Sequence, residues 1–250
     1  MKSPAIGVAL VAVLCLPTGI RSQTKAPESG AQLFDRIRDG LVHVGQAAGE
    51  SGSTLDHWLG SGFLVDGSCT VVTAKHLFDL ADPRRLLVRY QTPKDRATVQ
   101  TVVAVLIGES ADRDLAYLRL TTPDGGPCAN ELRPLPLSAR FDARTLAGES
   151  VLIAGFPRLG PYDVDIPVVR RGIVASAEGT DDAKKPMLLL DLTGVSGFSG
   201  SPVVLERTGE VIGVVYGPGL IERFADFEIA TPIDRTNLDA AKRTTGSSSP

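Results

Sequence analysis

Three short segments of this chain carry the residue types that nucleophilic catalysis needs. His76 ends the segment Thr73-Ala74-Lys75-His76, which directly follows an apolar run typical of a strand, Cys69 to Val72. A second segment holds Asp112 and Asp114 before alternating apolar residues, and a glycine-rich loop holds Ser196 and Ser199. A serine hydroxyl is a poor nucleophile at neutral pH and needs an adjacent base, and the base needs a third group to hold its tautomer. The order His, Asp, Ser, each at the edge of a predicted strand, therefore predicts acyl-transfer chemistry.

The serine-containing loop runs from Gly194 to Val204 and begins with three glycines within seven residues. Such a loop is tight and can expose backbone N–H groups beside a serine hydroxyl, where they would stabilise the anion that develops in acyl transfer. Taken one at a time, the three segments also fit ordinary roles, as a surface or core histidine, a turn aspartate and a hairpin loop. Their combination in one chain favours the catalytic interpretation.

The elements that must position these residues are short β-strands. Beyond Gly40, runs rich in Val, Ile and Leu alternate with Gly, Pro and Asp, without intervening amphipathic helices. This pattern favours antiparallel barrels or sandwiches over βαβ units. A loop rich in Pro and Gly at 121–134 divides the pattern into two similar halves, and a site built from both would lie in the cleft between them. The predicted strands are 41–45, 59–65, 69–73, 85–91, 97–108, 114–120, 135–138, 149–155, 166–176, 186–192, 201–206, 210–216 and 226–230.

Helical spacing of apolar residues predicts a helix over 31–38, and a second helix is expected over 233–242 with Asp234 as its N-cap. The predicted division of the chain is 1–22 signal peptide, 23–40 N-terminal extension, 41–122 first barrel, 123–135 linker, 136–232 second barrel, and 233–250 helix and tail.

The segments VVTAKHL, RDLAYLRL and GFSGSPVV resemble those of the trypsin-like (chymotrypsin-fold) serine proteases. The chain is most similar to the compact bacterial high-temperature-requirement type, which GSGFLVDG, RRGIVASAEG and GEVIGVVYG also match, and the resemblance covers about 33–240. It implies an all-β fold of two six-stranded antiparallel β-barrels and a serine endopeptidase that cleaves protein or peptide substrates without a cofactor. Because 19 residues follow Thr231, we expect no PDZ domain.

The resemblance implies that Ser199 is the nucleophile, since it occupies the serine of the Gly-x-Ser-Gly-x-Pro pattern that ends at Pro202. Ser196 is the competitor, but the position three residues after it is not proline. The backbone N–H groups of Gly197 and Ser199 would form the oxyanion hole. Phe198 departs from the family pattern, because many relatives carry Asp or Asn there.

The resemblance also implies that His76 is the general base and that Asp114 orients it. Asp112 fits less well because it lacks the Leu-Ala that follows Asp114.

The primary specificity pocket would lie at Thr193, Tyr216 and Gly217. Since a threonine offers no charge to Lys or Arg, we expect cleavage after small or medium apolar residues, although Asp191 lies close enough in sequence to keep cleavage after Arg open.

The N-terminus has the layout of a secretory signal peptide. Lys2 precedes an apolar run at Ala5–Leu16, and Ser22 offers a small residue for cleavage. The run is short for a membrane span, so we expect a secreted or periplasmic protein without stable membrane association; an uncleaved N-terminal anchor is the alternative.

Composition narrows the partners further. The chain has 250 residues, 43% of them hydrophobic, and a formal net charge of −3. It therefore has no basic excess for nucleic acid. The three histidines are scattered, so no metal site is expected. Whether Cys69 and Cys128 form a disulfide, and the oligomeric state, stay open.

Two rival functions remain. An α/β-hydrolase esterase uses the same residue types but in the order Ser, Asp, His, which this chain does not follow. The stronger rival is a catalytically silent or latent protease-fold protein that binds without turnover, because a fold does not by itself imply a function.

Overall fold

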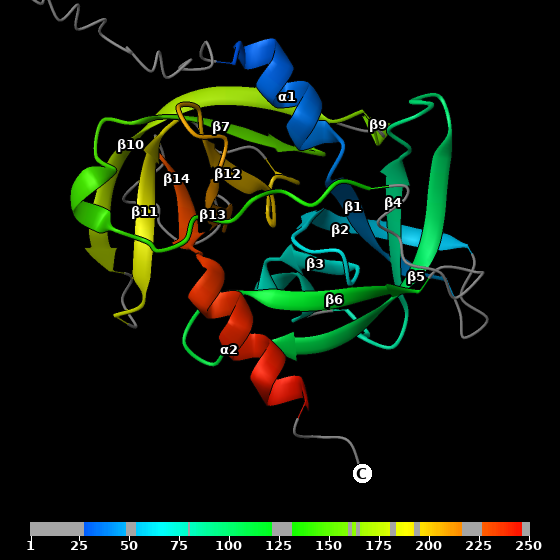
Figure 1. Cartoon of the computed structure of the whole chain (residues 1–250). Helices are drawn as coiled ribbons and strands as arrows, with labels where there is room; N and C mark the ends of the chain where they lie inside the picture. The colour runs from blue at the N-terminus through cyan, green and yellow to red at the C-terminus, as the bar shows by residue number, and fades with distance from the viewer. Residues whose placement is uncertain are drawn as a thin grey trace, which may run out of the picture.

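The computed structural model describes residues 28–48, 54–79, 81–121, 132–159, 162–163, 166–180, 184–192, 196–216 and 227–246. Two closed barrels of antiparallel strands lie side by side (Figure 1). The first barrel consists of β1 (Leu41–Ala47), β2 (Leu55–Leu64), β3 (Thr70–Thr73), β4 (Leu86–Gln91), β5 (Val99–Glu109) and β6 (Ala116–Thr121). The second consists of β7 (Ser150–Gly155), β10 (Val168–Thr180), β11 (Pro186–Asp191), β12 (Pro202–Leu205), β13 (Val211–Val215) and β14 (Glu228–Pro232).

The two barrels share one topology. Around the first barrel the strands follow the order β1-β2-β3-β6-β5-β4, and β4 pairs with β1 to close it. Around the second the order is β7-β10-β11-β14-β13-β12, and β12 pairs with β7. Counted along the chain, both orders are first, second, third, sixth, fifth and fourth strand. The prediction of an all-β chain with two six-stranded antiparallel barrels is therefore confirmed.

This shared topology puts the candidate catalytic residues at equivalent places. His76 lies between the third and fourth strands of the first barrel, and Ser199 lies between the third and fourth strands of the second. Asp114 lies in the connection from β5 to β6, and β6 pairs with β3, the strand that leads to His76. The strand order therefore brings Asp114 next to His76 although 38 residues separate them.

Burial divides the apolar side chains into three clusters. One fills the interior of the first barrel and includes Val44, Leu86 and Leu118, and another fills the second barrel. The third cluster lies between the barrels and joins residues of both, including Phe63 and Phe156. Because alternate residues of a strand point to opposite faces, one strand supplies both an interior and an interface cluster.

Each helix packs against the barrel that lies farther from it in the sequence. Helix α1 (Gly30–Arg38) precedes the first barrel but contacts β7 of the second, and α2 (Arg235–Gly246) follows the second barrel but contacts β5 of the first. Figure 1 shows the two helices on opposite sides of the molecule. Ser29 and Gln32 form a capping box at the start of α1, and Leu33 and Ile37 are buried on its inner face. No helix within the described residues is long and apolar enough to span a membrane.

Several local predictions need correction. The predicted strand at 135–138 is not a strand, since Leu137 makes only an isolated bridge to Val211. His76 does not lie at a strand end but in a short 3₁₀ helix, η1 (Lys75–Phe78). The structure adds a 3₁₀ helix, η3 (Ala143–Thr145), and a small hairpin of β8 (Arg158–Leu159) and β9 (Tyr162–Asp163) that the sequence pattern did not indicate. The predicted signal peptide lies outside the described residues.

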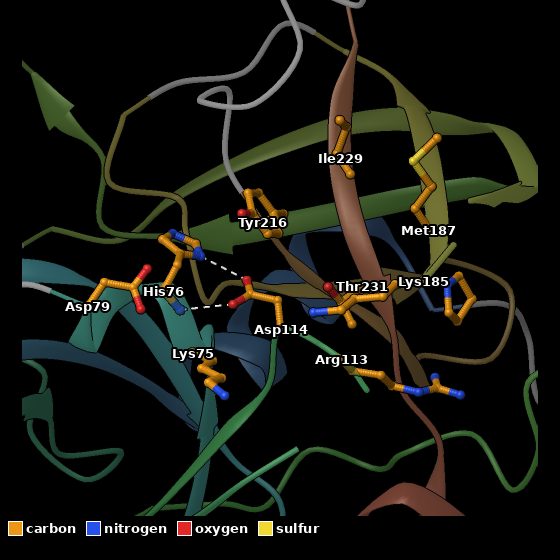
Figure 2. Close-up of a pocket in the computed structure, with 11 residues that line it drawn as sticks. Lys75, His76, Asp79, Arg113, Asp114, Lys185, Met187, Tyr216, Ile229 and Thr231 are labelled. Atoms are coloured by element: carbon orange, nitrogen blue, oxygen red, sulfur yellow. Dashed lines mark hydrogen bonds and ion pairs between the residues drawn. The ribbon is translucent and has the colours of Figure 1, made fainter. Parts of the chain in front are cut away.

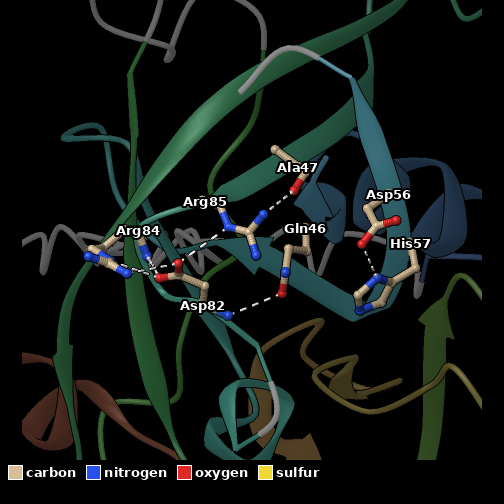
Figure 3. Close-up of polar contacts among 7 residues, drawn as sticks. All are labelled: Gln46, Ala47, Asp56, His57, Asp82, Arg84 and Arg85. Atoms are coloured by element: carbon tan, nitrogen blue, oxygen red, sulfur yellow. Dashed lines mark hydrogen bonds and ion pairs between the residues drawn. The ribbon is translucent and has the colours of Figure 1, made fainter. Parts of the chain in front are cut away.

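Polar contacts attach the segment after η1 to the end of β1 (Figure 3). The Asp82 N–H donates to Gln46 Oε1 at 3.1 Å, and the Arg85 side chain donates to the Ala47 carbonyl at 3.4 Å. A hydrogen bond from the Arg84 guanidinium lowers the pKa of Asp82 to about 2, so its carboxylate stays charged and keeps its arginine partners. These contacts hold the chain that leaves the His76 helix.

Cys69, directly before β3, is disulfide-bonded, and the other two cysteines of the chain, Cys15 and Cys128, lie outside the described residues.

Candidate active site

His76 and Asp114 form a hydrogen-bonded pair (Figure 2). The imidazole Nδ1 of His76 lies 2.8 Å from Asp114 Oδ2, and the His76 backbone N–H donates to Asp114 Oδ1 at 2.8 Å. A carboxylate only accepts hydrogen bonds, so Nδ1 carries the proton in this pair and the other ring nitrogen, Nε2, is left without one in the neutral ring. The Asp114 side chain is 12% exposed and that of His76 is 25% exposed, so both are largely shielded but reachable from the cleft.

The structure separates Asp112 from this pair. Its carboxylate accepts from the Ser110 hydroxyl at 2.7 Å, which lowers its pKa, and its side chain is 77% exposed. Asp112 therefore caps its own turn, and Asp114 is the aspartate beside the histidine.

Ser199 lies in the turn that precedes β12, between two glycines with positive φ. Gly197 has φ +94° and Gly200 has φ +86°, a backbone region that residues other than glycine rarely adopt. The Ser199 hydroxyl donates to the Tyr216 carbonyl at 3.0 Å. Among the described residues it makes no hydrogen bond to His76. Tyr216 links the two, because its carbonyl accepts from Ser199 and its ring lies beside that of His76.

The backbone of the Ser199 turn has three consecutive N–H groups without an acceptor among the described residues. The N–H groups of Gly197, Phe198 and Ser199 donate to none of the described residues, whereas the neighbouring Gly200 N–H donates to the Val215 carbonyl at 2.8 Å. The Ser196 carbonyl accepts from the Arg158 N–H at 2.8 Å. A peptide unit is planar and trans, so this bond turns the Gly197 N–H of the same unit to the opposite side.

The residue before the candidate nucleophile anchors this turn in the barrel. Phe198 is only 2% exposed and belongs to the apolar interior of the second barrel. The chain therefore buries an aromatic ring directly before Ser199.

A cavity of about 240 Å³ opens beside the His76–Asp114 pair. Tyr216 forms part of its wall, with its ring centroid 4.7 Å from that of His76 (Figure 2). The cavity is also lined by Lys75, which pairs with Glu109 at 3.0 Å, and by Lys185. Of the three residues expected in the specificity pocket, Thr193 and Gly217 lie outside the described residues, and only Tyr216 is described.

Sequence reasoning missed a buried aromatic stack at the junction of the barrels. The His43 ring stacks on Trp58 with centroids 3.7 Å apart and on Phe156 of the second barrel at 4.6 Å. The pKa of His43 is lowered from 6.5 to about 3, mainly by burial. The nearby positive charges of Arg89 and Arg158 contribute to the same shift. His43 is therefore neutral at physiological pH. Its isolated place in the sequence offered no signal for this role.

Sequence reasoning also gave no role to Ser61, although it lies within the segment GSGFLVDG. This residue is fully buried and hydrogen-bonded to the loop that carries Ser199. The signal was present only as part of the family motif.

No group of three or more His, Cys, Asp or Glu side chains within the described residues is arranged to hold a metal ion.

Two antiparallel six-stranded barrels, with a histidine–aspartate pair on one and a serine-bearing glycine turn on the other, define the chymotrypsin-type class of hydrolase folds. The chain belongs to the trypsin-like peptidase family: the family model of the trypsin-like peptidase domain matches residues 60–214, more than half of the chain. The resemblance seen in the sequence is therefore confirmed.

Two known proteins are similar to this chain in sequence or in structure. The chain is 32% identical over 160 residues to a protein of Pseudomonas savastanoi pv. phaseolicola (strain 1448A / Race 6) described as a probable periplasmic serine endoprotease, DegP-like. The match covers 62% of this chain and 28% of that protein, so the chain spans well under half the length of this curated relative. The crystal structure of Deg5 is similar with a TM-score of 0.60 and 25% identity, over 85% of this chain and 90% of that one.

Proposed function

We propose that this protein is a serine endopeptidase in which Ser199, His76 and Asp114 form the catalytic triad. The observation that carries the proposal is the 2.8 Å contact between His76 Nδ1 and Asp114 Oδ2. It leaves Nε2 as the proton acceptor for a serine hydroxyl, and the adjacent carboxylate stabilises the charged imidazolium that follows.

In this mechanism Ser199 Oγ attacks the scissile carbonyl while His76 takes its proton. The bond to the leaving amine then breaks as His76 returns that proton to the amine nitrogen, which leaves an acyl-enzyme that water hydrolyses by the same route. The N–H groups of Gly197 and Ser199 stabilise the oxyanion of each tetrahedral intermediate. Their lack of acceptors among the described residues supports this assignment.

One observation favours the rival of a latent or catalytically silent protein. The Ser199 hydroxyl donates to the Tyr216 carbonyl at 3.0 Å instead of to His76. Serine has three staggered positions about its Cα–Cβ bond, and catalytic hydrogen bonds are often incomplete before substrate binds. We therefore assign this bond to the resting enzyme, and a test of reactivity separates the two functions.

The test is labelling of the purified protein with a fluorophosphonate probe, together with Ser199→Ala, Ser196→Ala and His76→Ala. We expect labelling of the wild type and of Ser196→Ala, weak labelling of His76→Ala, and none of Ser199→Ala. Ser196 is the matched control because it belongs to the same loop but is exposed. A wild type that does not react would refute the proposal and favour the silent binding protein.

We further propose cleavage of protein or peptide substrates after small or medium apolar residues, because the expected pocket residue Thr193 carries no charge. Profiling with a peptide library tests this, and efficient cleavage after Arg would contradict it.

We also propose that the protein is exported to the periplasm or the medium after removal of residues 1–22. The printed description of the Pseudomonas relative as periplasmic supports this location. Sequencing the N-terminus of the exported protein tests it, with Gln23 as the expected first residue.

A further inference from the structure

Ser61 on β2 connects the first barrel to the turn that carries Ser199. It is fully buried, and its neighbours on the other side of the junction belong to the second barrel. Its hydroxyl donates to the Gly197 carbonyl at 3.0 Å, and its backbone N–H donates to the Ser199 carbonyl at 2.8 Å. One residue of the first barrel thus holds two carbonyls of the turn, 136 and 138 positions away in the sequence.

Other hydrogen bonds hold Ser61 itself in place. Its hydroxyl accepts from the Phe156 N–H at 2.9 Å, and its carbonyl accepts from the Thr73 hydroxyl at 2.6 Å. Thr73 ends the strand that leads to His76, so the same residue is bonded to the segments that carry the base and the nucleophile. The hydroxyl has one donor and one acceptor partner at ordinary distances, so both of its roles are used.

The backbone of neighbouring segments packs closely around Ser61. A Cβ added to Gly155 would lie 2.7 Å from Ser61 Oγ, and one added to Gly200 would lie 1.9 Å from the Ser61 carbonyl oxygen. Likewise, a Cβ on Gly60 would lie 2.7 Å from the Ser199 carbonyl oxygen. Three glycines therefore allow the two barrels to approach closely at this residue, and removal of the hydroxyl would leave buried polar groups unpaired.

The carbonyls that Ser61 bonds belong to the two peptide units that flank the unit carrying the Ser199 N–H. That central unit is itself held by the Ser201 N–H, which donates to the Phe198 carbonyl at 2.8 Å. The Gly197 carbonyl precedes the Phe198 N–H, and the Ser199 carbonyl precedes the Gly200 N–H, so the peptide units on either side of the Ser199 N–H have limited freedom to rotate. The Arg158 N–H holds the peptide unit of the Gly197 N–H from the other side. If Ser61 loses its hydroxyl, the Gly197 end of the turn loses its bond to the first barrel.

We propose that Ser61 is a positioning residue that holds the Gly197–Ser199 backbone in the orientation that stabilises the oxyanion. The inference rests on the proposed function, because it requires Ser199 to be the nucleophile. Ser61 itself touches no reacting atom. Its removal should therefore impair stabilisation of the tetrahedral intermediate and leave substrate binding unchanged.

The test compares Ser61→Ala with the wild type in peptide hydrolysis and in inhibition by a peptide aldehyde, whose adduct with Ser199 carries the oxyanion. Loss of one oxyanion donor costs about 10²- to 10³-fold in kcat, and a disturbed donor should cost less, so we expect a fall of about 10- to 100-fold. We expect KM to change less than about twofold and the aldehyde inhibition constant to rise by the same factor as kcat falls.

Ser201→Ala is the matched control. Ser201 is equally buried and lies in the same turn, but its hydroxyl has no hydrogen-bond partner among the described residues. We expect its kcat to stay within about twofold of the wild type. Ser61→Cys adds a graded measurement, because a thiol is a weaker donor than a hydroxyl; its kcat should lie between those of wild type and Ser61→Ala.

The outcomes separate the two hypotheses. An unreactive wild type refutes the proposed function and this inference with it. An active wild type with an equally active, folded Ser61→Ala overturns the inference alone, as does a loss that appears in KM and not in aldehyde inhibition. If Ser61→Ala does not fold, the same comparison is made on Ser61→Cys, and wild-type kcat and aldehyde inhibition there overturn the inference.

Discussion

Acid should destabilise this protein through one buried histidine. The His43 ring lies between Trp58 and Phe156, is 4% exposed, and has its pKa lowered from 6.5 to about 3 by burial. The unfolded chain takes up a proton on this ring below about pH 6.5, whereas the folded chain does not until about pH 3. Stability therefore falls as the pH is lowered through this window, because acid favours the state that binds the proton.

The size of the effect follows from the shift. Each pKa unit corresponds to about 1.4 kcal/mol. A pH of about 5 lies roughly 1.5 units below the pKa of this ring in the unfolded chain and still above its pKa in the folded chain. His43 should therefore cost about 2 kcal/mol of stability between about pH 7.5 and about pH 5. A loss of that size is a large part of the 5–15 kcal/mol that typically stabilises a folded protein.

The assay is urea unfolding at both pH values, followed by the fluorescence of Trp58, the single tryptophan of the chain. The Ser199→Ala background avoids self-cleavage. His43→Phe keeps an aromatic ring in the stack and removes the titration, so it should lose about 2 kcal/mol less than its parent on acidification. His57→Gln is the matched control, because that ring is half exposed. Equal losses in His43→Phe and its parent would refute the reasoning.

Further predictions concern the turn and the triad. Asp114→Asn should lower kcat by about 10⁴-fold, because an amide can stabilise the wrong imidazole tautomer. Asp112 is exposed and apart from the ring, so Asp112→Asn should keep a kcat near that of the wild type. Peptide hydrolysis measures both values. Gly200→Ala should lose more than about 2 kcal/mol of stability, because φ is +86° and the new Cβ would meet backbone at 1.9 Å. Gly67→Ala, with nothing within 4 Å, should change stability by less than about 0.5 kcal/mol, and equal unfolding midpoints for the two would contradict the packing argument. Phe198→Ala should cost about 3–5 kcal/mol in urea unfolding, because the ring is buried inside the second barrel; a loss below about 1 kcal/mol would show that the ring does not anchor the turn.

Local patterns were sufficient to predict most strands. Alternation of apolar and polar residues, broken by Gly, Pro and Asp, depends on neighbours in the chain, and it located strands in both barrels to within a few residues. The same logic failed at 135–138, where apolar residues pack against the junction cluster without regular strand pairing. Apolar character reports burial, and only hydrogen-bonding partners make a strand.

The motifs indicated which residue types could react, but distances between them are a tertiary property. Pairing of β3 with β6 brings Asp114 to His76, whereas Asp112 stays exposed in its own turn. From the sequence, Asp114 could be preferred to Asp112 as the partner of His76 only through the family resemblance.

By itself, the sequence determined the strand pattern, the family and the residue types of the candidate triad, because these depend on local periodicity and short motifs. Only the tertiary structure decided the resting direction of the Ser199 hydroxyl, the neutral state of His43 and the position of Ser61 beneath the turn. The Ser199 hydroxyl depends on the closing of the second barrel, which brings Tyr216 beside it. His43 and Ser61 depend on atoms of both barrels, whose contacts exist only when the two barrels have packed together. Burial and hydrogen bonding across that junction are therefore the physical terms that no local pattern contains.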